Sequence, residues 1–478
     1  MSSETSSPAV TRTEYDLLGY RELPGDVYWG IHTLRARENF PIAGTPISTH
    51  PDLITALGFV KQAAALTNLE LGLLPADKGT AIAAACAEIT NGELHDQFVV
   101  DVIQGGAGTS TNMNANEVIA NRALEILGYE RGAYHIIHPV DDVNRCQSTN
   151  DVYPTSIKVA VLFSTQRLRD AMRHLSEIFG EKSVEFSDII KMGRTQLQDA
   201  VPMTLGQEFG TYQVMIDEDI SRLTESASLL RELNLGATAI GTGLNAPPRY
   251  GSLACAHLGD LTGLPVGRAE NLIEATQDVG AFVHFSGVLK RIAVKISKIC
   301  NDLRLLSSGP RSGLGEINLP AVQAGSSIMP GKVNPVIPEV VNQVAFEVIG
   351  NDVTISFAAE SGQLQLNAFE PIIAHRTLES MAHLVGAFST LADRCVSGIT
   401  ANTTHLARTI EHSAGLATAL NPHIGYAAAT SVASEALRTG RSVVEIVAER
   451  ALLTPEQLRD ILSPSSLVGH GSNYSAGI

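Results

Sequence analysis

The chain has 478 residues, enough to bury a large core, and its length alone predicts about two to four domains. Hydrophobic residues make up 44% and charged residues 18%, as is typical of a soluble globular protein. The formal net charge of −16 argues against a surface that binds nucleic acid or an anionic membrane. No apolar run reaches membrane-spanning length, so we expect no membrane partner either.

The cysteines indicate a reducing compartment. They are odd in number, widely spaced and in no C-x-x-C pattern, which is typical of reduced thiols that fill a core. We therefore expect a cytoplasmic protein. Cys146 lies beside a polar cluster, and a nucleophilic role for it stays open, although no partner histidine is identifiable from spacing. The five are Cys86, Cys146, Cys255, Cys300 and Cys395.

The N-terminal third of the chain, residues 1–149, is predicted to form a mainly helical domain. Residues 1–12 are rich in serine and threonine but lack an apolar core and a cationic start, so they predict a flexible tail and not a signal peptide. Residues 26–40 mix aromatic residues with two arginines and read as a segment docked on the core. Residues 53–126 are mainly helical by composition.

A first polar cluster interrupts this helical region at residues 104–114, where glycines precede a helix predicted over 116–127. Such a segment exposes backbone N–H groups and hydroxyls at a helix N-terminus, which suits a carboxylate. A helix cap followed by a turn explains the residues equally well. The Gly-Lys-Ser/Thr ending of a Walker A loop is missing.

Two further polar clusters occupy residues 144–151 and 193–202. We expect each at a junction between a loop and a long helix, and each is dense in neutral hydroxyl and amide groups. Such groups are costly to bury without partners, so their repetition suggests convergence on one ligand.

A central domain over residues 150–404 is predicted to be a bundle of long helices. Apolar residues at steps of three and four form stripes over 157–179, 209–230 and 285–306, and the third helix would reach about 50 Å if it began at Ala275. Residues 339–355 and 370–391 add two helices, giving about five. The segment 234–245 breaks this pattern with three glycines, and residues 405–478 are predicted to form a small helical domain with a turn at 421–426.

The segment 307–335 contains glycines and prolines that forbid continuous helix or strand, yet it is too apolar for a solvated linker. We expect an ordered functional loop. Within it, Lys332 and Asn334 suit an α-carboxylate, since one supplies charge and the other a directional donor. Ser326 and Ser327 would then face the next atoms of the substrate. A serine- and glycine-rich surface turn is the alternative reading of the first residues.

Residues 325–335 read Gly-Ser-Ser-Ile-Met-Pro-Gly-Lys-Val-Asn-Pro. They closely resemble the Gly-Ser-Ser-x-Met-Pro-x-Lys-x-Asn signature of the fumarase/aspartase superfamily, and the resemblance extends over about residues 26–462. It implies a mainly α, three-domain fold whose long central helix bundle assembles into a tetrameric helical core. It also implies homotetrameric lyases that share active sites between subunits, break C–N or C–O bonds and release fumarate or a relative.

The resemblance also implies residue roles. Ser326 would be the general base that removes a C3 proton, once loop closure surrounds its oxygen with N–H groups and positive charge. Lys332 and Asn334 would hold the α-carboxylate of the substrate. Glu339 would lie behind the residues that contact the substrate. The β-carboxylate, which becomes a dianionic aci-carboxylate, would be bound by Thr109, Ser148, Thr149 and Ser327. The leaving group would be surrounded by Asn150, Thr195 and Gln196. This chemistry needs no metal or organic cofactor, and the histidines show no zinc spacing.

The leaving group decides between two branches of the superfamily. Gln196 follows Gly-Arg-Thr where fumarases commonly have histidine, so an imidazole–Glu339 pair is lost and no general acid can be assigned. Ammonium needs less protonation help than hydroxide, and segments 192–208, 234–245 and 362–367 also look like aspartases. Segments 138–142 and 421–426 look like fumarases, but Val140 replaces an asparagine of a secondary carboxylate site in that family.

The sequence therefore favours reversible deamination of L-aspartate to fumarate and ammonium. Fumarate hydratase activity on L-malate, or another amino-dicarboxylate lyase activity, is the alternative. A chain of the same fold without activity is a further alternative from a different class.

Overall fold

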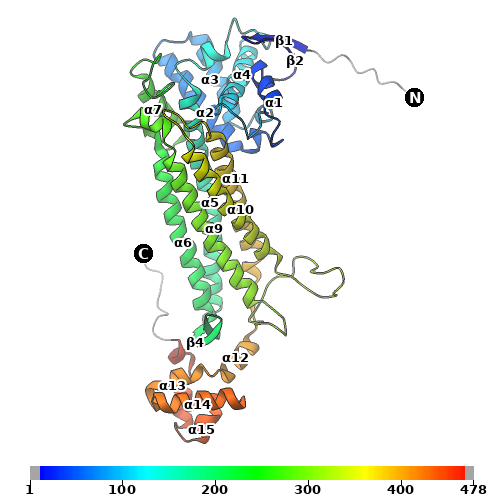
Figure 1. The fold of residues 1–478 in the computed structure, drawn as a ribbon, viewed down its shortest axis with the longest axis vertical. Coiled ribbons are helices and arrows are strands. Elements are labelled where there is room, and N and C mark those ends of the chain that lie inside the picture. Colours follow the sequence, from blue (N-terminus) through cyan, green and yellow to red (C-terminus); the bar gives the residue numbers. More distant parts are fainter. Residues whose placement is uncertain (1–10, 469–478) are drawn as a thin grey trace, which may run out of the picture. The chain divides into compact units, whose positions relative to one another are not determined.

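The computed structural model describes residues 11–468 and is mainly helical, as predicted (Figure 1). Of the predicted tail, residues 1–10 lie outside the described residues. Thr11 and Arg12 do not belong to a tail, because strand β1 (Thr11–Asp16) pairs antiparallel with β2 (Gly19–Pro24). The Arg12 guanidinium donates to the carbonyl oxygen of Val27 at 2.6 Å, which ties this strand to the following segment.

Two compact units are distinguished by their internal contacts, and each is described separately. The first unit contains the described residues up to Arg169, together with Ser221–Arg291 and Phe346–Leu384. The second unit contains Asp170–Ile220, Ile292–Ala345 and the described residues from Val385 onward. Because the units group discontinuous segments, the predicted domain boundaries at residues 149 and 404 stay a prediction.

The first unit contains the shorter helices of the N-terminal region and two more from residues 250–277. They are α1 (Ile31–Asn39), α2 (Pro51–Glu70), α3 (Ala76–Thr90), α4 (Thr109–Ile126), α7 (Tyr250–Thr262) and α8 (Leu272–Gln277), with strands β5 (Glu232–Leu233) and β6 (Gly267–Arg268) in parallel. Helix α4 begins before the predicted start at residue 116. The side chains of Asn112 and Asn114 bond to groups outside the helix, so they do not compete with its backbone hydrogen bonds.

Five long helices confirm the prediction for the central region. They are α5 (Thr149–Glu185), α6 (Leu205–Ser228), α9 (Gly280–Leu306), α10 (Val336–Glu360) and α11 (Glu370–Arg394), all labelled in Figure 1. Helix α9 begins at Gly280 and not at Ala275, because Ala275 belongs to the separate helix α8. The Asn271 side chain caps α8 by accepting from the backbone N–H groups of Ile273 and Glu274.

Polar contacts and aromatic rings join these helices within each unit. In the first unit, Ser286 and Lys290 of α9 both donate to Asp352 of α10. In the second unit, the Phe179 ring of α5 packs against the Tyr212 ring of α6 at 5.4 Å between centroids. Each unit therefore has a helical core that is built from segments of the long helices.

The second unit also contains a hairpin of β3 (Ile190–Thr195) and β4 (Gln198–Thr204), and the short antiparallel pair β7 (Ile317–Asn318) and β8 (Thr400–Ala401). The loop between α9 and α10 contains β7 and no helix, as predicted for 307–335. Among residues 11–468, no helix is both long and apolar enough to span a membrane.

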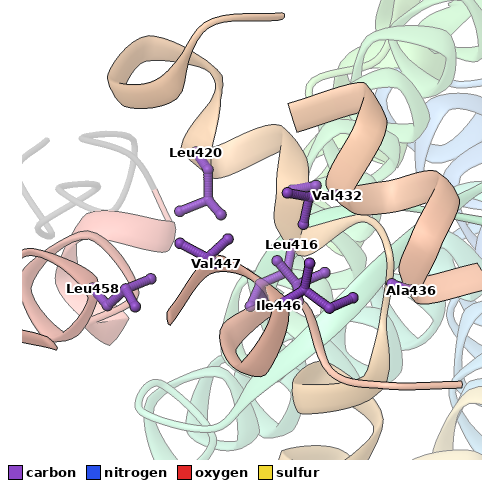
Figure 2. Close-up of a cluster of buried hydrophobic side chains, with 9 residues drawn as sticks. Leu416, Leu420, Val432, Ala436, Ile446, Val447 and Leu458 are labelled. Atoms are coloured by element: carbon purple, nitrogen blue, oxygen red, sulfur yellow. The ribbon is translucent and has the colours of Figure 1, made fainter. Parts of the chain in front are cut away.

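The C-terminal region is a small helical cluster, as expected. Its helices are α12 (Thr403–His412), α13 (Leu416–Ile424), α14 (Tyr426–Thr439), α15 (Val443–Glu449), α16 (Pro455–Ile461) and α17 (Pro464–Leu467). Figure 2 shows side chains of α13 to α16 that form its buried apolar cluster, among them Leu420 of α13, Val432 of α14 and Val447 of α15. The turn predicted at 421–426 is shorter than expected, since α13 continues to Ile424 and only Gly425, with φ of +82°, separates it from α14.

Candidate active site

The first polar cluster forms the start of helix α4 in the first unit. Gly106 and Gly108 both have φ of +88°, a backbone conformation that suits glycine. A Cβ atom added to Gly108 would lie 2.2 Å from a ring carbon of Tyr153, so this turn packs directly on α5. Thr109 is the exposed first residue of α4, and its hydroxyl donates to the Gly106 carbonyl oxygen at 2.8 Å.

The second cluster is a turn that ends where α5 begins, at Thr149. The Ser148 hydroxyl accepts from the Asn150 backbone N–H at 3.2 Å, and the Ser148 N–H donates to Asp151 at 2.9 Å. Asn112 of α4 donates to the Thr149 hydroxyl at 3.1 Å. Two helix N-termini therefore meet here, and their partial positive charge favours a bound carboxylate.

The glycine-containing segment 234–245 docks on the first turn of α5. The buried Asp151 carboxylate accepts from the backbone N–H groups of Gly236 at 3.1 Å and Thr238 at 2.9 Å. Asn150 donates its side-chain amide to the Ala239 carbonyl oxygen at 2.7 Å. Burial raises the pKa of Asp151 to about 6, and its backbone hydrogen bonds act in the opposite direction. Sequence reasoning noticed this segment as a break in the helices and as a stretch that looks like aspartases, but did not predict its contact with α5.

The third cluster lies in the second unit, where it forms a hairpin and not the expected loop, and the long helix α6 begins at Leu205 directly after it. Thr195 and Gln196 lie at the exposed tip of the β3–β4 hairpin, where Gln196 and Leu197 have positive φ angles of 54° and 62°. Two such residues suit a tight hairpin turn.

A buried ion network supports the base of this hairpin. Lys191 of β3 pairs with Glu316 at 2.7 Å, and Arg194 pairs with the other Glu316 oxygen at 2.5 Å. Lys191 also pairs with Glu208 of α6 at 2.5 Å. The side chains of Lys191 and Glu316 are each only 2% exposed, so the charges stabilise one another away from water.

The signature loop, residues 325–335, lies in the second unit, and two hydrogen bonds join its two ends at what we call its neck. The Gly325 N–H donates to the Lys332 carbonyl oxygen at 2.9 Å, and the Asn334 amide donates to the Gly325 carbonyl oxygen at 2.6 Å. The loop lines a cavity of about 560 Å³ to which Ser326 and Lys332 contribute. Ser327 is exposed.

The Ser326 hydroxyl oxygen accepts two backbone hydrogen bonds, from Ile328 at 3.2 Å and Met329 at 3.0 Å. Hydrogen bonds donated to an oxygen stabilise its negative form. The loop therefore supplies part of the environment that a serine base requires, and Lys332 is among the residues that line the same cavity.

The predicted site residues fall into three groups. Thr109, Ser148, Thr149 and Asn150 come together at the start of α4 and α5 in the first unit. Ser326, Ser327, Lys332 and Asn334 share the loop of the second unit, and Thr195 and Gln196 share the hairpin tip. Within the described residues of the second unit, no hydrogen bond or ion pair joins the hairpin tip to the loop.

Glu339 lies in the first turn of α10, and its N–H donates to the Pro335 carbonyl oxygen at 3.1 Å. No histidine pairs with its carboxylate in the described part of the chain. Over residues 11–468, no three His, Cys, Asp or Glu residues are grouped so that they could hold a metal ion.

Comparison with known proteins decides the family. Residues 19–350 match a family model described as "Lyase", and residues 416–469 match "Fumarase C C-terminus". The chain is 57% identical to an aspartate ammonia-lyase of Pseudomonas fluorescens over 469 residues, which cover 98% of each chain. The chain belongs to the fumarase/aspartase superfamily. It is also 56% identical to an aspartate ammonia-lyase of Escherichia coli K12 over 458 residues, or 96% of each chain.

Solved structures of superfamily members share the fold. A fumarate lyase:delta crystallin from Brucella melitensis, bound to cobalt, has a TM-score of 0.93 at 57% identity and covers 95% of this chain and 99% of its own. A class II fumarase from Schistosoma mansoni has a TM-score of 0.90 at 34% identity and covers 95% and 98%. The predicted superfamily fold is confirmed.

Sequence reasoning missed one buried residue of this superfamily member. Lys61 of α2 is fully buried and donates to Asn144 and Gln147 in the turn before Ser148. The available signal was a single lysine that follows Phe59 and Val60 and shortly precedes three alanines, because a charged side chain among apolar neighbours needs a partner.

Proposed function

We propose that the protein is an aspartate ammonia-lyase that reversibly converts L-aspartate to fumarate and ammonium. The observation that carries this proposal is the identity of more than half of its residues with aspartate ammonia-lyases over nearly the whole chain. The lower identity of 34% with a class II fumarase is in keeping with this choice. Gln196, which replaces the histidine common in fumarases, supports the same choice.

Ser326 is the proposed general base. As an alkoxide it takes a proton from C3 of aspartate, and the electrons move into the adjacent β-carboxylate to form an aci-carboxylate. The two backbone N–H groups on the Ser326 oxygen and the cation of Lys332 favour its ionised form. The C–N bond then breaks, the electrons of the aci-carboxylate form the double bond of fumarate, and ammonia leaves and is protonated.

The developing charge on the β-carboxylate is proposed to be stabilised at the two helix N-termini and by the loop. Thr109, Ser148 and Thr149 bring hydroxyls to the first turns of α4 and α5, where the helix dipoles favour an anion. Ser327 would add a donor from the loop. Lys332 and Asn334 would bind the α-carboxylate.

The leaving group is proposed to lie near Asn150, Thr195 and Gln196. The Asn150 amide nitrogen donates to the Ala239 carbonyl oxygen, and its side-chain oxygen is an acceptor that suits an ammonium. None of the three is an acid, and ammonia departs with less protonation than hydroxide requires. Neutral residues here therefore suit deamination better than dehydration.

The protein is further proposed to be a homotetramer with active sites shared between subunits. Helix α10 exposes apolar side chains at Phe346, Val353 and Phe357, with exposed fractions of 62%, 51% and 69%. Gly350 lies between them at the same heptad-like spacing, and a small residue lets a partner helix approach closely. Light scattering on the purified protein should give about four times the chain mass, and a monomer would contradict this proposal.

The cellular location is proposed to be the cytoplasm. All five cysteines are free thiols and four are buried, which suits a reducing compartment. Fractionation of the source cells with an antibody against the protein would test this.

The activity is tested by incubating the purified protein separately with L-aspartate and L-malate. Equal amounts of fumarate and ammonia from aspartate, with no fumarate from malate, are expected. Fumarate from malate alone would replace the proposal with a hydratase. If neither substrate gives fumarate or ammonia, the result would favour an inactive protein of this fold or a different amino-dicarboxylate substrate.

A further inference from the structure

Lys61 contacts the turn of residues 144–147, which leads directly to Ser148 and Thr149. It is 0% exposed, and its ammonium donates to Asn144 Oδ1 and Gln147 Oε1, both at 2.9 Å. Burial of an ammonium is costly unless an anion compensates it. Among residues 11–468, however, no carboxylate forms an ion pair with Lys61, and both of its acceptors are neutral amides.

Both amides fold back onto the backbone of the turn. Gln147 donates to the carbonyl oxygens of Val143 at 2.9 Å and Arg145 at 3.2 Å, and Asn144 donates to that of Gln147 at 3.2 Å. Cys146, between them, has φ of +62°, which is uncommon for a residue other than glycine. Such a conformation persists where the surroundings fix it, and the Lys61 contacts do so together with the Asn68 amide, which donates to the Arg145 carbonyl oxygen at 3.1 Å.

The same amides connect Lys61 to the proposed carboxylate site. Asn144 Oδ1 accepts a second hydrogen bond from Asn112 at 3.1 Å, and Asn112 also donates to the Thr149 hydroxyl at 3.1 Å. Lys61, Asn144, Asn112 and Thr149 therefore form one continuous chain of polar contacts between α2, the turn, α4 and α5.

In the part of the chain that the structure describes, no anionic group contacts the Lys61 ammonium. Asp151 of α5 acts on it electrostatically, but that carboxylate is bonded to three backbone N–H groups. The Cys86 thiol of α3 is neutral, because burial raises its pKa to about 12. Helix α4 contributes neutral asparagines, and the Tyr250 hydroxyl of α7, near Asp151, is neutral because burial raises its pKa.

We propose that Lys61 is a positioning residue whose buried positive charge, acting through Asn144 and Gln147, fixes the Ser148–Thr149 turn and favours a dicarboxylate dianion there. This inference rests on the proposed function, which takes that turn as the carboxylate site. It explains why the turn is built on a lysine and not on a neutral side chain of similar length.

Protonation of Lys61 and binding of a dianion should be thermodynamically coupled, and this coupling can be measured. Burial lowers the pKa of Lys61 to about 7, so above pH 7 most of the free protein carries it neutral. A bound dianion stabilises the protonated form and raises that pKa. Binding above pH 7 therefore takes up a proton, and the affinity for the dianion falls as pH rises through this range.

The probe is fumarate, whose carboxyl groups do not titrate near pH 8. Calorimetric titration of the full-length protein at pH 8, in two buffers with different ionisation enthalpies, measures the proton uptake. A group with a pKa of about 7 is about one-tenth protonated at pH 8, so wild-type protein is expected to take up roughly 0.5 to 0.9 proton per site.

Two variants separate charge from hydrogen bonding. Lys61→Met removes the charge and the donors, whereas Lys61→Gln keeps an amide donor without the charge. Both should abolish the proton uptake, weaken fumarate binding at pH 6 at least about tenfold, and raise KM for aspartate. The matched control is Thr67→Val, since Thr67 is equally buried on α2 and its hydroxyl donates only to the Ala63 carbonyl oxygen. It should keep the wild-type proton uptake and affinity.

The inference is overturned if wild-type protein binds fumarate without proton uptake, or if Lys61→Gln keeps the uptake and the affinity, as a purely structural role would allow. If Lys61→Met does not fold, the wild-type titration and the Lys61→Gln variant still test the proposed role of Lys61. A protein that turns over aspartate but lacks Lys61-dependent uptake overturns this inference alone. A protein that neither converts aspartate nor binds fumarate overturns it together with the proposed function.

Discussion

The Asn334 amide donates to the Gly325 carbonyl oxygen at 2.6 Å, so the signature loop is closed at its neck by one of the residues expected to bind substrate. An amide nitrogen carries two hydrogens, and the second stays available for a carboxylate. Asn334 therefore connects the shape of the loop with recognition of the substrate.

Replacement of Asn334 by alanine removes both contacts. We expect kcat/KM for aspartate to fall about 100-fold or more, because the loss of one well-placed donor has an effect of this size. The melting temperature should change little, since the loop is mostly exposed. Steady-state kinetics check this, with Ser307→Ala at the end of α9, outside the cavity lining, as the control. Activity within twofold of wild type would show that the neck contact is dispensable.

Replacement of Ser326 by alanine should leave almost no turnover, since general-base catalysis contributes about 10² to 10⁴-fold and water cannot take its place in the loop. Fumarate binding and the oligomeric state should be unchanged. The control is Ser307→Ala, which lies outside the loop neck at the end of α9, where its hydroxyl only donates to the Arg304 carbonyl oxygen. Retained turnover of Ser326→Ala would refute the base assignment.

The long helices and the loop were predictable because their signals are local and repeated. Apolar residues at steps of three and four determine α5, α6 and α9, and glycine with proline excludes helix from 307–335. The roles of the site residues came from the resemblance to a family, not from pattern, since a hydroxyl in a turn looks the same whether or not it binds substrate.

The features that were missed depend on distant partners. The β3–β4 hairpin is stabilised by the pairing of Lys191 with Glu316, which lies far along the chain. Helix α4 extends into an asparagine-rich turn because Asn112 bonds to Thr149. Lys61 meets Asn144 only after folding. No short-range pattern encodes these contacts.

Gly108→Ala tests whether the packing of α4 on α5 matters for function. The new methyl group would lie 2.2 Å from the Tyr153 ring, and φ of +88° is itself strained for alanine. Gly128→Ala is a matched control, because Gly128 has φ of +83° but nothing within 4 Å of the added carbon. Both should lose about 1 kcal/mol to backbone strain, and only Gly108→Ala should lose about 1 to 3 kcal/mol more by overpacking, together with most activity. Equal losses in chemical denaturation would contradict a role for the contact.

Glu370 predicts a pH dependence of stability. It is buried, its Oε2 has no hydrogen-bond partner among residues 11–468, and burial raises its pKa to about 8 while Lys158 acts in the opposite direction. The folded state therefore retains a proton that the unfolded chain releases near its ordinary pKa. Stability from this group is fully present below about pH 4.5 and is lost as pH rises toward about 8, by up to about 1.4 kcal/mol per pH unit.

Glu370→Gln mimics the protonated acid at every pH. The stability of the variant relative to wild type should therefore increase between pH 5 and pH 8 and level off above that range. Melting temperatures of both proteins across this range measure the difference, in which contributions from other groups cancel. Glu360→Gln, at the exposed end of α10, should show no such trend. A flat difference for Glu370→Gln would mean that Glu370 is ionised in the folded protein.

The ion network under the hairpin predicts the largest loss of stability. Glu316→Gln keeps the volume of the side chain but leaves Lys191 and Arg194 with no full charge opposite them at this position. Breaking a buried pair costs about 3 to 5 kcal/mol, because the remaining charge stays in a poorly solvated place. Glu208 still contacts Lys191 at 2.5 Å, so the loss should fall toward the lower end. The same change should also affect activity. The hairpin carries Thr195 and Gln196, so turnover should fall even at temperatures where the variant is folded.

Denaturant unfolding measures the loss of stability, and kinetics at low temperature measure the loss of turnover separately. Glu225→Gln removes the exposed pair with Arg222 on α6 and should change neither. If Glu316→Gln were as stable as that control, the network would not be what fixes the hairpin.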